Sequence, residues 1–118
     1  MSDAYDLFRE GQQRLRKGMT AQATVPLEKA KKLEPAKASI REALGIAYFR
    51  LARWQDAERE FRAIVEELSP TDHYAHYALG RALEHQGKTA EANGHYKLAS
   101  SMNPASETYS SRILDLDA

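Results

Sequence analysis

Apolar residues recur along this chain three and four positions apart, which is the spacing of an amphipathic helix. Leu44, Gly45 and Tyr48 share one helical face, and Ala57 and Phe61 share another soon afterwards. Glycine and proline interrupt this pattern at regular places. The pattern predicts helices at residues 4–17, 20–33, 37–51, 54–68, 72–86, 89–101 and 106–116.

The same residues return in register about every 34 positions. Gly45 lies 34 residues after Gly11, and Gly80 lies 35 residues after Gly45 (45−11 and 80−45). Further columns are Ala23, Ala57 and Ala92; Leu27, Phe61 and Tyr96; and Pro35, Pro70 and Pro104. We therefore expect three helix pairs, at residues 4–35, 38–70 and 72–104, in a single domain that spans residues 1–118.

The second copy carries the fullest version of this pattern: Leu44-Gly45-x2-Tyr48, then Trp54-x2-Ala57-x3-Phe61, then Pro70. It resembles the tetratricopeptide repeat, a helix–turn–helix unit of about 34 residues with the pattern W-x2-L-G-x2-Y…A-x3-F…P. The resemblance implies an all-α fold. That fold is a right-handed α-solenoid of antiparallel helix pairs, with three tetratricopeptide motifs and a capping helix at 106–116.

The small residues of the pattern have a physical reading of their own. Gly45 and Ala57 lack bulk, so two helix axes can approach closely, while Tyr48 and Phe61 fill the space beside them. Glycine inside a helix costs about 1 kcal/mol relative to alanine. Three glycines in register therefore indicate close helix contacts that offset this cost.

The first copy departs from the pattern, with Glu10 in the column of Leu44 and Arg14 in the column of Tyr48. An end repeat has solvent on one side, where polar residues are tolerated. Pro26 lies inside the second helix of this copy and removes one backbone hydrogen bond. We expect it to kink that helix without breaking it.

The second copy is one residue longer than the first, and the extra residue falls between Phe61 and Leu68. Two outcomes are open at this point. The extra residue lengthens the end of the helix, or it distorts the last helical turn.

Composition narrows the class of protein. The chain has 118 residues, of which 42% are apolar and 29% charged, and its lack of cysteine excludes disulfides and cysteine metal sites. The first six residues do not form the basic and apolar segment of a secretion signal. No apolar run approaches the ~20 residues that a membrane helix needs. We therefore expect a cytoplasmic protein that does not bind membranes.

The net charge is zero, but the two halves differ. Residues 1–53 carry 11 Lys/Arg and 6 Asp/Glu, and residues 54–118 carry 6 Lys/Arg and 11 Asp/Glu, which gives +5 against −5. Sequence order is spatial order in a solenoid, so opposite charges should lie at opposite ends. This favours a weak homo-oligomer if an apolar patch also contributes to the contact between copies, with Ile113 or Leu116 of the capping helix as candidates.

The resemblance implies that the first helix of each repeat lines the concave side of the solenoid. Aromatic residues beside arginines, which protein interfaces enrich, project from these helices. We expect this groove to bind a peptide or protein segment, although some of its residues would also fit as packing between neighbouring repeats. The groove residues are Tyr5, Phe8, Gln12, Arg16, Glu42, Ile46, Phe49, Arg50, Tyr74, Tyr77, Arg81 and His85.

Some members of the family clamp the C-terminal carboxylate of chaperones with lysine, asparagine and arginine on these helices. In this chain the matching places hold Phe8, Gln12, Ala43, Tyr74 and Ala78, so that clamp is absent. Arginine presents a planar fork that suits carboxylates, and this favours an acidic or amphipathic segment as the guest.

Other functions find less support. No glycine-rich phosphate loop, nucleophile elbow or H-E-x-x-H motif is present, so we expect no enzymatic activity and no cofactor. His73 and His76 have a spacing that can share a metal, but without a third ligand we interpret them as solvated histidines. His85 and His95 stand alone on different helices. The basic run at 29–32 with a balanced net charge favours a solvated face over nucleic-acid binding.

These observations favour a protein–protein interaction scaffold that binds a peptide or protein segment in its groove. The alternative is a structural or assembly subunit that self-associates through the ends or faces of the solenoid.

Overall fold

The structure is a computed structural model that describes residues 3–113, and every regular element in this range is helical. Helices and no strands were expected, and this part of the chain confirms it. The helices are α1 (Ala4–Arg16), α2 (Thr20–Leu33), α3 (Ala38–Arg50), α4 (Trp54–Ala63), the π-helical η1 (Ile64–Leu68), α5 (His73–Glu84), α6 (Thr89–Met102) and α7 (Glu107–Ser110).

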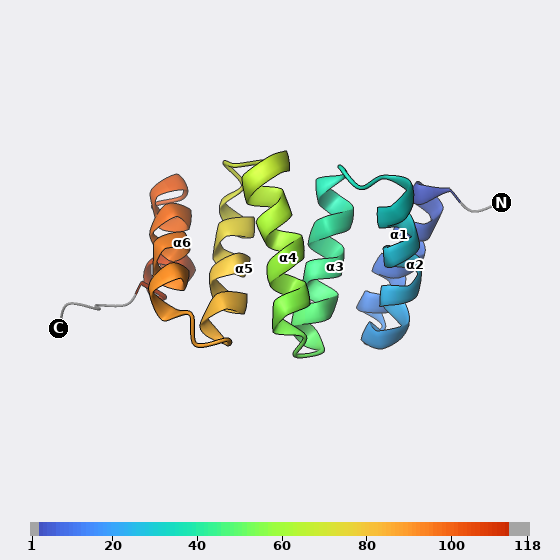
Figure 1. Cartoon of the computed structure of the whole chain (residues 1–118), viewed down its shortest axis with the longest axis horizontal. Coiled ribbons are helices and arrows are strands. Elements are labelled where there is room, and N and C mark those ends of the chain that lie inside the picture. Colours follow the sequence, from blue (N-terminus) through green and yellow to red (C-terminus); the bar gives the residue numbers. More distant parts are fainter. Residues whose placement is uncertain (1–2, 114–118) are drawn as a thin grey trace.

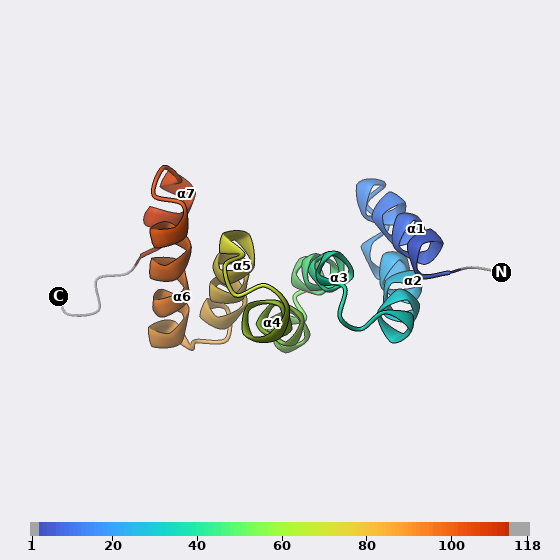
Figure 2. The ribbon, with the colours of Figure 1, turned by 90° about the horizontal axis from the view of Figure 1, so that it is seen from above.

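The helices stand side by side in chain order along a row about 55 Å long, with α1 and α2 at one end and α6 at the other (Figure 1). Viewed from above, α1 and α7 rise on the same side of the row, and α3 and α5 lie lower between them (Figure 2). The same view places α2, α4 and α6 on the other side. The row is thus an α-solenoid whose concave side carries α1, α3 and α5.

Each of the three helix pairs is held at its closest point by a glycine. A Cβ atom on Gly45 would lie 2.6 Å from the ring of Phe61, and one on Gly80 would lie 2.5 Å from the ring of Tyr96. Gly11 meets Leu27 in the same way. The close contacts that the sequence predicts at these glycines are therefore present in all three pairs.

The turn inside each repeat requires a residue with positive φ. Gly18 and Gly87 have φ values of 77° and 78°, and the matching residue of the second repeat is Ala52, with φ 59°. Glycine adopts this left-handed region without steric cost, whereas alanine is strained there by about 1 kcal/mol or more. The backbone of the repeat thus imposes the same turn even where glycine is missing.

The extra residue of the second repeat is absorbed by the π-helical segment η1. The N–H of Ser69 donates to the carbonyl of Ile64, five residues back, at 2.7 Å. A single inserted residue inside a helix produces this pattern because one residue has to be looped out of the regular ladder. Of the two outcomes left open by the sequence, distortion of the last turn is the one observed.

Helix α2 continues through Pro26 without a break, as expected. Proline has no N–H to donate, so the carbonyl of Gln22, four residues earlier, loses its helical partner. The Nη1 atom of Arg14 donates to this carbonyl at 2.9 Å, and Nη2 of Arg14 donates to Glu10 at 2.5 Å. The polar residues of the first repeat therefore have a structural role as well as a solvated position.

The capping helix at the end of the row is shorter than the expected 106–116. Ser106 caps α7 by accepting from the N–H of Tyr109 at 3.3 Å, but the helix ends at Ser110. The N–H groups of Arg112 and Ile113 bond only three residues back, and this tighter geometry ends the helix. Residues 114–116 of the expected helix lie outside the described residues.

We predict that Gly45→Leu destabilises the protein by about 1–3 kcal/mol or more, because the new side chain is forced into the ring of Phe61. Gly94→Ala is the matched control. Gly94 is exposed in the interior of α6 and a Cβ there meets nothing within 4 Å, so alanine should stabilise by about 0.5–1 kcal/mol. Urea unfolding of both variants measures the difference, and an unchanged midpoint for Gly45→Leu would contradict the packing described above.

A double-mutant cycle tests the link between Arg14 and Pro26. Arg14→Ala should cost about 0.5–1.5 kcal/mol, since it leaves the carbonyl of Gln22 with water alone. In a Pro26→Ala background the restored N–H serves that carbonyl, so the same substitution should cost less. The ion pair with Glu10 is lost in both backgrounds and cancels. Equal costs from urea unfolding would show that the two residues are independent.

Candidate functional site

An open cleft lies on the concave side between α3 and α5. Its volume is about 240 Å³. Four aromatic or aliphatic side chains and two arginines form most of its wall, and the ring of Phe61 reaches it from α4. The lining residues are Ile46, Phe49, Arg50, Phe61, Tyr74, Tyr77, Ala78 and Arg81.

A second hollow of about 260 Å³ lies between α1 and α3. Ile46 and Arg50 line both hollows, so the two form one groove that crosses α3. The second hollow is lined by Phe8, Gln12, Leu15, Arg16, Ser39, Glu42, Ala43, Ile46 and Arg50. Tyr5 and Phe8 line a further hollow at the N-terminal end, beside Lys37 and Ile40.

Eleven of the twelve residues that the sequence assigns to the groove line these three hollows. His85 does not. Its ring stacks on Trp54, with centroids 4.1 Å apart and planes at 12°, and the edge of Phe49 meets it at 5.3 Å. The sequence assigns His85 to the outward stripe, but it carried no sign that Trp54 from the preceding helix α4 stacks on this ring.

The sequence analysis missed Phe61 as a lining residue. Phe61 belongs to the repeat column that packs against the helix-pair glycine, and it is only 1% exposed. Its ring nevertheless meets Tyr74 edge-on at 6.4 Å, at the floor of the cleft. No sequence signal separates this role from core packing, because one side chain performs both.

The tyrosines of α5 form the far wall of the cleft and are held by their neighbours. Tyr74 and Tyr77 have ring centroids 6.3 Å apart, and Tyr77 contacts Tyr109 of α7 at 5.1 Å. Tyr109 is buried, and its hydroxyl lies 2.8 Å from Nδ1 of His73. The short capping helix thereby buttresses the aromatic wall of the groove.

The arginines of the groove have no carboxylate partner within the described residues. Arg81 lies over the ring of Phe49, 5.3 Å from its centroid, and donates to the hydroxyl of Tyr77 at 3.2 Å. Arg50 donates only to the carbonyl of Leu15, at 3.4 Å. Within residues 3–113, both guanidinium groups keep free donors at the edge of an apolar cleft, so this edge carries positive charge.

The opposite end of the groove is acidic. Glu42 is half-buried, and burial together with the charge of Asp72 raises the pKa of its carboxyl above the ordinary value of 4.5. The carboxylate of Asp72 itself caps α5 by accepting from the N–H of Ala75 at 3.0 Å. Burial, and then the nearby Glu42, likewise raises the pKa of Tyr74.

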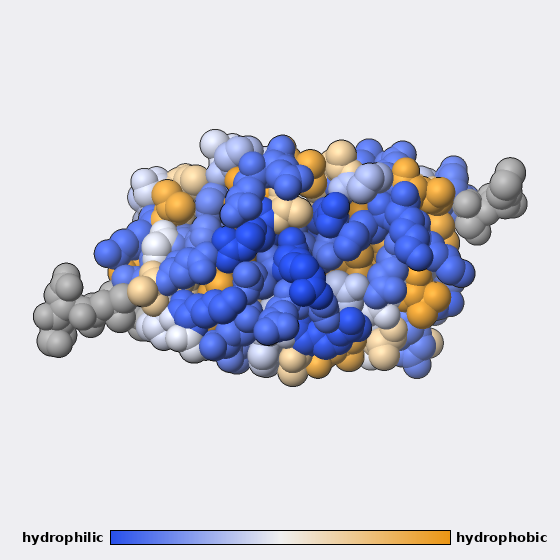
Figure 3. All heavy atoms as spheres, in the orientation of Figure 1, coloured by the Kyte–Doolittle hydropathy of each residue, from blue (hydrophilic) through white to orange (hydrophobic). Residues whose placement is uncertain are grey.

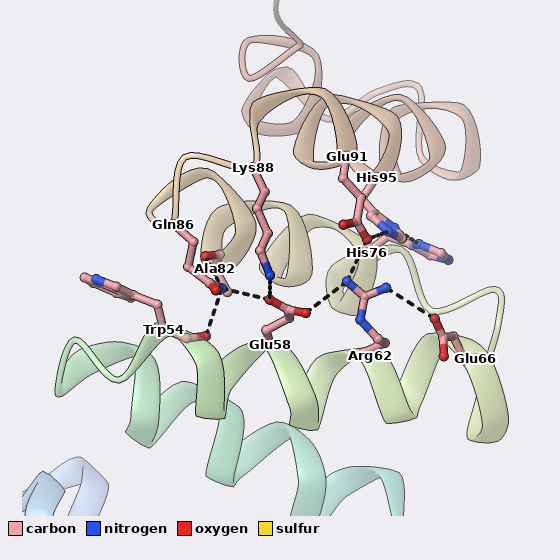
Figure 4. Close-up of polar contacts among 10 residues, drawn as sticks. All are labelled: Trp54, Glu58, Arg62, Glu66, His76, Ala82, Gln86, Lys88, Glu91 and His95. Atoms are coloured by element: carbon pink, nitrogen blue, oxygen red, sulfur yellow. Dashed lines mark hydrogen bonds and ion pairs between the residues drawn. The ribbon is translucent and has the colours of Figure 1, made fainter.

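The outer face formed by α2, α4 and α6 has a different character. It is mostly hydrophilic (Figure 3). Several of its charges are paired: Arg62 of α4 donates to Glu58 of the same helix at 3.1 Å and to Glu91 of α6 at 2.6 Å, and Lys88 donates to Glu58 at 3.1 Å (Figure 4). Paired charges on this face contrast with the unpaired arginines of the groove.

The histidines of α5 are not the solvated residues that the sequence analysis expected. His76 is 6% exposed, and its ring packs against that of His95, which the sequence analysis treated as isolated. The antiparallel packing of α5 on α6 brings the two residues together from 19 positions apart, which no local spacing reveals. Within residues 3–113, no group of three or more His, Asp or Glu side chains could hold a metal ion.

The apolar patch proposed for self-association is only partly available. Ile113 packs against the hydrophobic core of the chain, and Leu116 lies outside the described residues. Among the helices described here, none has both the length and the apolar composition needed to cross a bilayer.

The fold and the repeat pattern agree with a family match. The family model described as tetratricopeptide repeat matches residues 30–106, so this chain belongs to the tetratricopeptide repeat family. A comparison with curated proteins finds no matching sequence. The family is typically a non-enzymatic protein-interaction fold.

Solved structures share the fold at low sequence identity. The first tetratricopeptide domain of Spaghetti (RPAP3), bound to the HSP90 peptide SRMEEVD, is 22% identical with a TM-score of 0.88, covering 94% of this chain and 87% of that one. A crystal structure of MamA is 23% identical with a TM-score of 0.89, covering 93% of this chain but only 64% of MamA. The second tetratricopeptide domain of RPAP3 is 18% identical with a TM-score of 0.81, covering 86% and 94%.

We predict that Glu42 titrates above 4.5 in an NMR pH titration of its carboxyl group. Because the folded chain binds this proton more tightly than the unfolded chain, ionised Glu42 weakens the fold at neutral pH. Glu42→Gln should therefore raise the stability at pH 7, and this advantage should shrink at pH 4. Asp72→Asn, which keeps the cap on α5, should lower the pKa of Glu42 only partway, since burial is the larger cause. Titration of Glu42 at or below 4.5 would contradict this.

Proposed function

We propose that this chain is a non-enzymatic interaction module that binds a peptide or protein segment in the groove of α1, α3 and α5. The observation that carries the proposal is that Arg50 and Arg81, at the edge of an aromatic cleft, have no carboxylate partner among residues 3–113. On the outer face, Arg59 and Arg62 are paired with carboxylates of the chain. A groove that leaves its arginines unpaired is suited to a guest that supplies carboxylates.

The chemistry of the groove favours an acidic and amphipathic guest. Apolar side chains of the guest fit against Ile46, Phe49 and Tyr74, and its carboxylates reach the guanidinium groups beside them. Aromatic residues and arginine are the residue types that contribute most to binding in protein interfaces. A helix or an extended segment with apolar and acidic residues in alternation meets both requirements.

The guest differs in kind from a chaperone tail. The RPAP3 domain of similar fold is bound to an HSP90 peptide. In this chain the places that match the family's carboxylate clamp hold Phe8, Gln12, Ala43, Tyr74 and Ala78, and none of these carries a positive charge. We infer that the guest is anchored by its apolar side chains and by internal carboxylates.

Selection from a display library of random peptides on the immobilised chain tests the proposal without a known partner. The enriched peptides should combine acidic with apolar residues. Arg50→Ala together with Arg81→Ala should weaken their binding by about tenfold or more, because a hydrogen bond to a charged group contributes about 1.5–3 kcal/mol. Fluorescence anisotropy of a labelled selected peptide measures the change.

Arg59→Ala is the matched control for this experiment. Arg59 lies exposed on α4, pairs with Asp56 and belongs to the outer face, so its loss removes one positive charge without touching the groove. Its effect on peptide affinity should be small. Affinity that survives the double substitution, or that falls equally in the control, would place the binding surface outside the groove.

A further inference from the structure

The second and third repeats make the same pair of contacts with different side chains. Arg41 and Glu60 of the second repeat lie 35 positions before His76 and His95 of the third (76−41 and 95−60). In each repeat the first of these residues bonds to the proline carbonyl that precedes its helix, and the second reaches it from the partner helix. The contacts of Arg41 with Glu60 and of His76 with His95 are thus directly comparable.

The junction between the first and second repeats is held by permanent charges. Arg41 donates from Nε to the carbonyl of Pro35 at 2.9 Å and from Nη1 to Glu60 at 3.1 Å. Lys31 of α2 donates to the other oxygen of Glu60 at 2.7 Å. Arginine, lysine and a carboxylate keep their charges between pH 5 and pH 8. This junction should therefore not respond to pH in that range.

The matching contact in the third repeat depends on one proton between two histidine rings. Nε2 of His76 lies 2.8 Å from the carbonyl of Pro70, which can only accept, so this nitrogen carries a hydrogen. Nδ1 of a neutral His76 then has a lone pair, and Nδ1 of His95, 3.0 Å away, must be the donor. The two rings meet in this way between α5 and α6 (Figure 4). A single hydrogen occupies the space between the two facing nitrogens.

A second hydrogen cannot fit between these two Nδ1 atoms. With both rings charged, each Nδ1 would carry a hydrogen, the bond between them would be lost, and two positive charges would face each other at 3.0 Å. His76 is 6% exposed, so water screens this repulsion poorly. Protonation of both histidines therefore opposes the packing of α5 on α6, whereas Nε2 of a charged His76 still donates to the carbonyl of Pro70.

The charged groups around the pair do not remove this conflict. Glu91 of α6 lies 3.9 Å from Nε2 of His95, but Arg62 of α4 already bonds to the same glutamate oxygen at 2.6 Å. Glu66 of η1 is likewise bonded to Arg62, at 3.3 Å. The net result is that burial, followed by the neighbouring His76, holds the pKa of His95 below its ordinary value of 6.5.

We propose that the His76–His95 pair is a pH-sensitive latch that loosens α5 from α6 in the third repeat as the pH falls from about 7 to 5, while Arg41 and Glu60 hold the matching contact of the second repeat throughout. Helix α5 forms one wall of the cleft between α3 and α5, so the shape of the cleft depends on the latch. The effect on a guest rests on the proposed function of the groove. The effect on the third repeat does not.

The direction of the pH effect on stability follows from the linkage between proton binding and folding. A histidine with a lowered pKa in the folded chain takes up its proton more readily in the unfolded chain, where the value is about 6.5. Its contribution to stability is complete above about pH 7. It is lost as the pH falls through 6.5 and below, toward the lowered pKa of the folded state.

Amide hydrogen exchange at pH 7.5 and pH 5.0 tests the latch without any guest. Protection factors, which correct for the intrinsic pH dependence of exchange, should fall by about tenfold in α5 and α6 at pH 5.0 and much less in α1 and α2. The key variant is His76→Arg with His95→Glu. It places in the third repeat the same arginine–glutamate pair that Arg41 and Glu60 form in the second. This variant should keep its protection at both pH values.

A milder variant covers the case in which the exchanged pair fails to fold. His95→Gln keeps an N–H donor for Nδ1 of His76 but removes one titrating ring, and it should lose less protection than the wild type at pH 5.0. His85→Gln is the control, since His85 lies outside the pair, and it should behave as the wild type does. Equal losses in the wild type and in His95→Gln, or NMR titration of His76 and His95 independently near 6.5, would overturn the proposal. A failure of peptide selection on the groove would leave this exchange result unaffected.

Discussion

The close approach of two helices at a glycine is the contact on which the rest of the structure depends. Gly11, Gly45 and Gly80 each face a large side chain of the second helix at a distance that leaves no room for a Cβ atom. Because this contact is the same in all three repeats, the helix pairs have similar shapes and can stack in one direction. Stacking places α1, α3 and α5 on a common side, and that side holds the groove.

The distribution of charge partners separates the two faces of the solenoid. On the outer face, ion pairs connect α4 with the start of α6 and tie the second repeat to the third. They join Arg62 to Glu58 and Glu91, and Lys88 to Glu58. In the groove, Arg50 and Arg81 have aromatic or carbonyl neighbours but no carboxylate partner among the described residues. A surface whose charges are already paired offers little to a partner, whereas unpaired guanidinium groups beside an apolar cleft remain available for one.

Departures from the repeat pattern are compensated locally. Pro26 deprives Gln22 of a backbone donor, and Arg14, which replaces a tyrosine of the pattern, supplies that donor. The extra residue of the second repeat is looped into η1. His76 and His95 take the place of an arginine–glutamate pair and keep the bond to the proline carbonyl. In each case the backbone of the repeat keeps its shape, while the side chains that form the supporting hydrogen bonds differ.

The sequence by itself determined the helical class, the repeat register and the residues that face the concave side. These follow from periodicity along single helices and from the recurrence of the repeat, and both can be read from the sequence: the columns of small residues already indicate close helix contacts, and the outward stripe already contains Arg50 and Tyr77. The tertiary structure alone decided which side chains from different helices meet. The pairing of His76 with His95, the stacking of Trp54 on His85 and the hydrogen bond from Arg14 to the carbonyl of Gln22 all depend on distances between helices. Those distances are set by packing across the whole repeat, and no spacing within one helix encodes them.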